Sequence, residues 1–325
     1  MTGKGNHNTP ACSLVIRCFN EEAHIGRLLT GIMAQTLKDV EIIVVDSGST
    51  DATLSIASQY PVKILTITPE QFSFGRSLNI GCAAATSDFI AIASAHVYPV
   101  YTDWLEHLLK PFADSGVAIV YGKQRADGAA KYAEHMIYKK WYPDESTTDQ
   151  RHPFCNNANA AIRRSLLEAH PFNEALTGLE DLDWAKRAIE RGEKVAYSAE
   201  AEIVHVHNET LTRVYHRYMR EAIAFKHIYP HERFRFLDFV RLVAGNILSD
   251  CYYAAHDRML VKNVSQIVSF RFMQFWGAHR GFSRRALISQ QVRNRLYYPN
   301  GLAKAGADGS VREAEGAIEY ECRHH

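Results

Sequence analysis

The stretch EIIVVDSGSTD (residues 41–51) indicates the fold class of this 325-residue chain. An apolar run ends at Asp46 and a turn of small residues follows, which is typical of a buried strand that stops at a polar site. Similar apolar runs stand upstream at residues 12–18 (CSLVIRC) and downstream at residues 89–93 (FIAIA). Segments with apolar residues every three to four positions separate these runs. The alternation predicts an α/β fold with a mainly parallel sheet that helices cover on both faces.

Polar residues follow three of the predicted strands directly, namely Asn20, Asp46 and the tripeptide Ser94-Ala95-His96. Ligands of such sheets bind beyond the carboxyl ends of the strands, so these side chains are candidates for a site. A carboxylate in the position of Asp46 can accept hydrogen bonds from a ribose or a base, and Ser49 can cap the next helix. An ordinary turn with a cap explains the same residues equally well.

A second candidate is the segment FGRSLNIG (residues 74–81), which begins a predicted helix. Arg76 and Asn79 stand three residues apart, so they lie on one side of that helix. There they can contact a nucleotide or a diphosphate, helped by the positive end of the helix. The alternative is a surface arginine beside a polar first turn.

A third candidate is the segment LEDLDW (residues 179–184). Either acid of the pair Glu180-Asp181 can deprotonate an incoming hydroxyl if a cleft holds it. Trp184 follows one helical turn after Asp181 and can stack on a sugar ring. The alternative is structural, because the helix dipole favours acids in the first turn in any case.

A fourth candidate is His205-Val206-His207. Residues two apart on a strand point to the same face, so both imidazoles can meet a phosphate or a metal. No third ligand stands nearby in the sequence, and a structural pair of histidines is an equal alternative.

The chain divides into three parts by composition. We expect a catalytic domain over 1–210, a helical extension over 211–295 and a flexible tail over 296–325. Within the catalytic domain, residues 123–155 are expected to be irregular, and two short strands are expected at 195–198 and 203–206. Residues 211–290 hold 13 Lys/Arg against 5 Asp/Glu, a basic surplus that fits an anionic partner such as a membrane surface. A solvated helical face explains the charge equally well. No recognised nucleic-acid module is present, so nucleic acid is not an expected partner.

The six cysteines are scattered and form no CxxC pair, which predicts reduced thiols. The first ten residues contain no apolar core of a secretory signal, and no stretch reaches about 18 uninterrupted apolar residues. We therefore expect a cytoplasmic protein without a membrane-spanning helix. A dehydrogenase is disfavoured because no GxGxxG follows the first strand.

Taken together, the blocks resemble glycosyltransferase family 2 enzymes of the GT-A fold. The resemblance covers roughly residues 12–210 and rests on SLVIRCFNEEAHIGRLL (13–29), EIIVVDSGSTDAT (41–53), GRSLNIGCAAATSDFIAIASAHVYP (75–99), NANAAIRR (157–164) and GLEDLDW (178–184). It implies a single displacement at the anomeric carbon with inversion. On the donor side it implies roles for Phe19, Asn20, Glu21, Asp46, Ser49, Arg76, Asn79, Ser94 and His96. On the acceptor side it implies Asp181 as the general base, with Glu180 and Trp184 as binding residues.

The sequence departs from the family at Ser94-Ala95-His96, where a metal-binding Asp-x-Asp motif is usual. One interpretation is a divalent cation held by His96 and His207, with Mn²⁺ favoured over Mg²⁺ because Mg²⁺ prefers oxygen ligands. Direct contact of these residues with the leaving phosphate, without metal, is an alternative. An unusual donor or an inactive site is a third.

The resemblance extends to a subgroup near bacterial rhamnosyltransferase-like enzymes, through FSFGRSLNIG and SAHVYP. It implies transfer from a nucleotide sugar to a glycan or lipid-linked glycan in surface polysaccharide synthesis. Transfer to a polyprenyl phosphate and a nucleotide-binding regulator without turnover are the alternatives. Residues 211–295 are expected to rest on the inner face of the membrane, to pack on the catalytic domain or to form a homo-oligomer contact.

Overall fold

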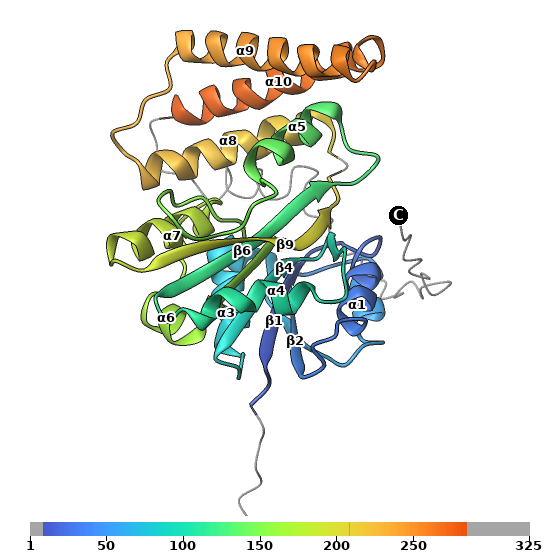
Figure 1. Cartoon of the computed structure of the whole chain (residues 1–325), viewed down its shortest axis with the longest axis vertical. Coiled ribbons are helices and arrows are strands. Elements are labelled where there is room, and N and C mark those ends of the chain that lie inside the picture. Colours follow the sequence, from blue (N-terminus) through green and yellow to red (C-terminus); the bar gives the residue numbers. More distant parts are fainter. Residues whose placement is uncertain (1–8, 208, 285–325) are drawn as a thin grey trace, which may run out of the picture.

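The computed structural model describes residues 9–207 and 209–284. One nine-stranded sheet has the order β3-β2-β1-β4-β8-β6-β9-β5, with β7 paired to β9. The strands are β1 (Cys12–Cys18), β2 (Val40–Asp46), β3 (Val62–Thr66), β4 (Phe89–Ser94), β5 (Val97–Pro99), β6 (Val117–Ala126), β7 (Thr147–Gln150), β8 (Asn159–Arg163) and β9 (Lys194–His205). Helices flank this sheet, and a layer of long helices lies over one end of it (Figure 1).

The first four strands are parallel and end together at one edge. Cys18 at the end of β1 lies opposite Asp46 at the end of β2, and Arg17 lies opposite Ser94 at the end of β4. The predicted polar strand ends therefore meet in space. This part of the sheet confirms the predicted strand runs.

Two apolar clusters fill the two faces of the sheet, because alternate strand residues point to opposite sides. One cluster contains side chains of α1 (Ile25–Met33), α2 (Thr53–Ala57) and α4 (Trp104–Leu109). The other contains side chains of α3 (Phe74–Ala83), α6 (Arg164–Ala169) and α7 (Glu180–Glu190). The prediction that helices cover both faces is confirmed.

The sheet is parallel in its first half and mixed in its second half, where β6 and β9 are parallel and the other pairs are antiparallel. β8 runs antiparallel to both β4 and β6, and β5 and β7 run antiparallel to β9. A fully buried apolar run reads the same in either direction, so the sequence predicts the strands and not their direction. The two short strands expected after residue 194 are one strand, β9, whose pairing with β6 shifts register between Gly122 and Gln124.

Residues 123–155, expected to be irregular, contain the helix α5 (Tyr132–Trp141). This helix packs between the sheet and the C-terminal helices α8 (Leu211–Ile228), α9 (Phe236–His256) and α10 (Leu260–Phe282) (Figure 1). The C-terminal helical extension is thus confirmed, while the predicted flexible tail over 296–325 lies outside the described residues.

A buried ion pair fixes the helical layer to α5. Arg271 of α10 donates to both carboxylate oxygens of Asp250 of α9, at 2.7 and 3.0 Å, and to the carbonyl of Ala133 at 3.3 Å. Both charged side chains are at most 5% exposed. Among the described helices, none combines the length and apolar character needed to cross a bilayer.

Candidate active site

Asp46, which is 1% exposed, closes the loop after β2. Its carboxylate accepts hydrogen bonds from the backbone N–H groups of Gly48 and Ser49, each at 3.0 Å. Gly48 has φ +89°, a conformation that favours glycine. The turn role of Asp46 is therefore present in the structure, and its contact with a ribose or base stays a prediction. Ser49 does not cap the next helix, because α2 begins at Thr53 and its N-cap residue is Ala52.

The loop after β1 lies against that turn. The Asn20 N–H donates to Ser49 Oγ at 2.9 Å, and the Thr50 N–H donates to Asn20 Oδ1 at 2.8 Å. Asn20 is not the helix cap that its position suggests, because α1 begins after His24. These bonds hold the half-buried Phe19 and Glu21 of the same loop beside the turn, as the predicted nucleotide pocket requires.

Two residues of α3 differ in their surroundings. Asn79 donates to the carbonyl of Phe172 and accepts from the N–H of Phe172, both at 3.0 Å. Its amide thus joins α3 to a loop, and its predicted donor contact stays a prediction. Arg76 is 46% exposed and lies 3.9 Å from Glu174, so its donor role stays a prediction.

Three histidines converge beyond the ends of β4 and β9. The pairing of β5 with β9 sets Val97 opposite His205, which brings His96 next to His205 and His207. One ring nitrogen from each lies within 4.8 Å of the others. The pairing of two strands thus adds a third imidazole, that of His96, to a pair from which it is distant in the sequence.

Each imidazole in this cluster has its Nδ1 near an oxygen. His96 Nδ1 lies 2.7 Å from Glu21 Oε1, and His205 Nδ1 lies 2.8 Å from Gln124 Oε1. His207 Nδ1 lies 3.8 Å from Glu134 Oε1. A carboxylate or amide behind the outer nitrogen is the usual arrangement for a metal-bound histidine, because it orients the ring and raises its basicity.

The cluster also has the charge state that a metal ligand needs. Burial, together with the neighbouring His207 and His96, lowers the pKa of His205 well below its ordinary value. Burial likewise lowers the pKa of His207. Neutral imidazoles are competent ligands, so the residues fit a divalent cation, and a set of nitrogen donors fits a transition-metal ion better than Mg²⁺.

Asp181 lies buried in the first turn of α7. Its carboxylate accepts from the N–H of Asn157 at 3.0 Å and from the N–H of Leu182 at 2.8 Å. Burial, and next the charge of Glu180, raise the pKa of Asp181 to about 7. Leu179, directly before the pair, has φ +57°, an uncommon conformation for a non-glycine residue that is often found at functional sites.

The two predicted acceptor-binding residues beside Asp181 have structural roles instead. Glu180 is 4% exposed and pairs with Arg17 at 3.3 Å. Trp184 is fully buried in the apolar cluster under α7, and its indole N–H donates to the carbonyl of His170 at 2.6 Å. A ring with no exposed surface cannot stack on a sugar, so the assignment of Trp184 is wrong. Residues three or four apart share one face of a helix whether that face is buried or meets a ligand, so the spacing alone could not show that Trp184 is buried.

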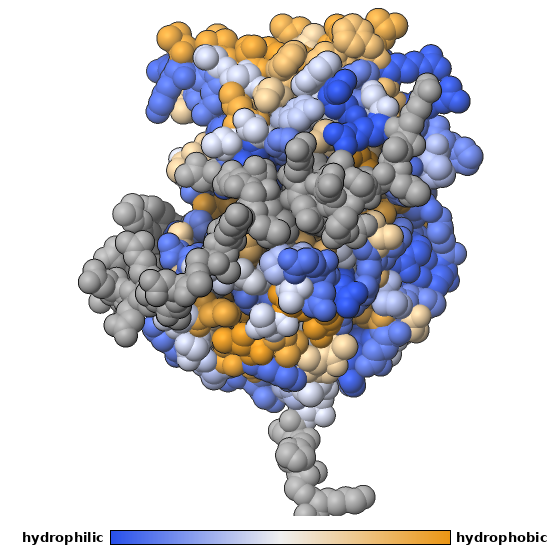
Figure 2. All heavy atoms as spheres, turned by 180° about the vertical axis from the view of Figure 1, so that it is seen from behind, coloured by the Kyte–Doolittle hydropathy of each residue, from blue (hydrophilic) through white to orange (hydrophobic). Residues whose placement is uncertain are grey.

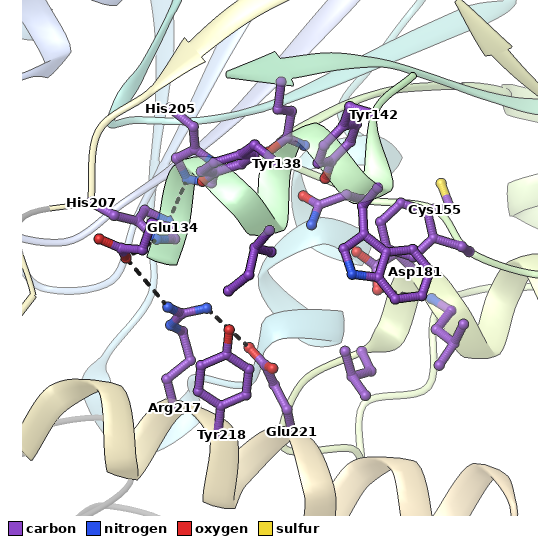
Figure 3. A pocket seen from close by; sticks show the side chains of 17 residues that line it. Glu134, Tyr138, Tyr142, Cys155, Asp181, His205, His207, Arg217, Tyr218 and Glu221 are labelled. Carbon is purple, nitrogen blue, oxygen red and sulfur yellow. Dashed lines mark hydrogen bonds and ion pairs between the residues drawn. The ribbon is translucent and has the colours of Figure 1, made fainter. Parts of the chain in front are cut away.

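A cavity of about 220 Å³ joins Asp181 to His205 and His207 (Figure 3). One wall comes from α5 and the residue that follows it, with Glu134, Tyr138 and Tyr142. The opposite wall comes from α8, with Arg217, Tyr218 and Glu221. Asp181 and Cys155 lie at one end, and His205 and His207 lie at the other.

The polar groups of the α8 wall form a charged network. Arg217 Nε donates to Glu209 at 2.8 Å, and its other nitrogens lie 3.8 Å from Glu134 and 4.0 Å from Glu221. Burial is the largest influence on Glu221 and raises the pKa of its carboxyl. Glu134 Oε1, on the α5 wall, is buried between His207 and Arg217, each 3.8 Å away, and makes no shorter hydrogen bond in the described structure.

Most residues of the two cavity walls were not predicted from the sequence. Tyr138 lies in a segment expected to be irregular, and Arg217 and Glu221 lie in a helix assigned to the extension. The four-residue spacing of Arg217 and Glu221 is a detectable signal of a shared helical face. Nothing in the sequence shows that this face meets Asp181.

Comparisons with known proteins agree with this geometry. The family model "Glycosyl transferase family 2" matches residues 13–170. The O-antigen chain rhamnosyltransferase WbaN of Salmonella anatum is 33% identical over 226 residues, which cover 66% of this chain and 72% of WbaN. RfbN of Salmonella typhimurium, also an O-antigen chain rhamnosyltransferase, is 31% identical over 65% of this chain and 71% of its own.

Solved structures show the same GT-A architecture. The mannosyltransferase PcManGT from Pyrobaculum calidifontis, in complex with GDP-Man and Mn²⁺, has a TM-score of 0.59 at 17% identity, over 85% of this chain and 88% of its own. S. aureus TarS 1–349 in complex with UDP has a TM-score of 0.51 at 15% identity, over 83% and 91%. The fold is therefore GT-A with a C-terminal helical extension, and the chain belongs to glycosyltransferase family 2.

Proposed function

We propose that the enzyme transfers a hexosyl or deoxyhexosyl group from a nucleotide sugar to a hydroxyl of a glycan or lipid-linked glycan, with inversion. The observation that carries this proposal is one cavity with two chemically different ends, Asp181 at one end and His205 with His207 of the histidine cluster at the other (Figure 3). The three-histidine cluster suits a donor diphosphate, and Asp181 suits an acceptor hydroxyl. The rhamnosyltransferases WbaN and RfbN support a deoxyhexose as the donor sugar and polysaccharide synthesis as the context.

On the donor side, we assign His96, His205 and His207 to a divalent cation, with Mn²⁺ favoured over Mg²⁺. Such a cation would stabilise the negative charge that develops on the leaving diphosphate. Glu21 and Gln124 orient two of the rings from behind. The turn closed by Asp46 lies at the same edge of the sheet, where the nucleotide would bind.

On the acceptor side, Asp181 acts as the general base. A pKa of about 7 lets this carboxylate take a proton near neutral pH, where a more acidic carboxylate would be a weaker base. The acceptor oxygen then bonds to the anomeric carbon, the bond from that carbon to the diphosphate breaks, and the proton stays on Asp181. Attack opposite to the leaving group inverts the anomeric configuration.

The cavity wall suits a sugar acceptor. The rings of Tyr138 and Tyr142 offer flat apolar faces, with Trp141 next to them. Glu134 and Arg217 offer hydrogen bonds to ring hydroxyls. A wall that mixes aromatic faces with charged hydrogen-bonding groups is the chemistry expected for a carbohydrate.

The test is a donor-hydrolysis and transfer screen of UDP-, GDP- and dTDP-sugars, with EDTA, Mg²⁺ or Mn²⁺. We expect turnover with Mn²⁺ and its loss in EDTA. Asp181→Asn should lower transfer by about 10²–10⁴-fold and leave donor binding intact. Asp183→Asn is the matched control, because Asp183 pairs with Arg187 at 3.0 Å outside the cavity. Full transfer by Asp181→Asn would refute the base, and donor binding without turnover would indicate a regulator.

A further inference from the structure

The outer surface of the helical extension carries large apolar side chains that face solvent. Val261 is 95% exposed, Leu237 78%, Leu248 71% and Tyr252 70%. Figure 2 shows apolar residues gathered along the end of the molecule that α9 and α10 occupy. Side chains this apolar and this exposed across two helices indicate an interaction surface.

The apolar residues of α9 form one stripe. Leu237, Val240, Ala244, Leu248 and Tyr252 follow one another at intervals of three or four residues, so they share a helical face. All five are exposed, whereas Phe239 and Ala254 on the inner side are buried. The helix is therefore apolar on both sides, whereas a helix whose outer face contacts water usually carries polar residues there.

An apolar groove continues this surface between the helices. It has a volume of about 630 Å³ and is lined by Val243 and Ile247 of α9 and by Val264, Val268 and Phe272 of α10, among others. Its walls offer hydrocarbon surface and little hydrogen bonding. A groove of this composition suits acyl or prenyl chains.

The charges around the apolar surface have one predominant sign. Six basic side chains between residues 231 and 282 are exposed: Arg233, Arg235, Arg241, Arg258, Lys262 and Arg280. Only Glu232 and Asp257 are exposed acids among the described residues of that range, with Asp238 half-buried. A second copy that met this face symmetrically would bring like charges together. Anionic lipid headgroups complement them.

From these observations we infer that the α9–α10 face binds the surface of an anionic lipid bilayer. The apolar stripe enters the headgroup region and the arginines contact lipid phosphates. The buried Arg271–Asp250 pair holds this face rigidly against α5, which forms one wall of the active-site cavity. Docking would therefore hold the cavity in a fixed orientation to the membrane, which suits a lipid-linked acceptor. Only this link to the acceptor rests on the proposed function.

The test is cosedimentation of the full chain with vesicles of phosphatidylcholine alone and of phosphatidylcholine mixed with phosphatidylglycerol. We expect binding to the mixed vesicles that salt weakens. The double substitution Leu248→Glu with Val261→Glu should lower the bound fraction by about tenfold or more. The control is Met33→Glu with Tyr101→Glu, two side chains of the catalytic domain that are 47% and 54% exposed.

Three outcomes would overturn the inference. The chain binds neither kind of vesicle, or the double variant binds as the unsubstituted chain does. In the third outcome, the chain does not bind vesicles but forms a dimer that the double substitution disrupts. That result would assign the face to a second copy of the chain. Vesicle binding is measured without sugar transfer, so it can succeed or fail independently of the proposed activity. Transfer to a soluble acceptor should be unchanged in the double variant.

Discussion

The Nε2 atoms of His205 and His207 lie 3.0 Å apart at the end of β9. Both histidines have lowered pKa values, largely through burial. Two imidazoles with converging nitrogens therefore lie beside His96, at the position where the family usually provides carboxylates. We propose that these nitrogens, in place of the missing acids, bind the cation.

Removal of one imidazole should weaken metal binding. We expect His207→Ala to raise the Mn²⁺ concentration for half-maximal activity by more than about tenfold, and Glu21→Gln to raise it by about 10–100-fold, because Glu21 orients His96. Isothermal titration with Mn²⁺ alone gives the affinity without turnover. His135→Ala on the exposed side of α5 is the control. Unchanged Mn²⁺ affinity in His207→Ala would remove this residue from the site.

The pH dependence of transfer should follow Asp181. Its pKa is raised to about 7, and only the ionised carboxylate accepts a proton. The rate should therefore rise as pH increases through about 7 and level off above it. A kcat/KM profile between about pH 5 and 9 measures this. A profile that is flat across this window would contradict the assignment.

Stability should respond to the same group with the opposite sign. A carboxyl group with a pKa raised in the folded state binds its proton more tightly than in the unfolded chain, so stability decreases as pH rises from about 4 to about 7. Asp181→Asn removes this ionisation. The variant should gain thermal stability relative to the unsubstituted chain, and the gain should be larger at pH 8 than at pH 5. Asp183→Asn, whose partner Arg187 lies nearby, should show no such gain.

The parallel half of the fold could be predicted from the sequence, because each strand there is an apolar run that ends in a polar turn. The direction of β8 could not, since its residues are buried on both faces. Only part of the histidine cluster could be predicted from the sequence. His205 ends β9 and His207 follows it two residues later, but the pairing of β5 with β9 that adds His96 is a long-range contact.

On the acceptor side, the assignment of Asp181 as the base stays a prediction, and the stacking role of its neighbour Trp184 is wrong. A spacing of three residues places Trp184 near Asp181 along the helix, but the tryptophan faces the sheet and is buried. Likewise, Arg217 and Tyr138 meet only because α8 and α5 pack over the sheet. Such contacts depend on tertiary packing and leave no local pattern in the chain.

The buried pair of Arg271 and Asp250 should stabilise the helical layer. Asp250→Ala leaves a buried guanidinium without its partner and should lower the free energy of unfolding by about 3–5 kcal/mol. The double substitution Asp250→Leu with Arg271→Met should recover most of that loss, because it leaves no unpaired charge. Urea unfolding followed by circular dichroism gives both values. A double variant as unstable as Asp250→Ala would show that the pair acts through other contacts.

The crossing of α10 over α8 depends on glycine. A Cβ on Gly277 would clash with the backbone carbonyl oxygen of Tyr215, so Gly277→Ala must push the helices apart. We expect it to lower the free energy of unfolding by about 1–3 kcal/mol. Gly245→Ala in α9 is the matched control, because nothing lies within 4 Å of its added methyl group. That variant should instead gain about 0.5–1 kcal/mol, since alanine favours a helix over glycine. If both substitutions stabilise the protein, the close approach of α8 and α10 is not present in solution.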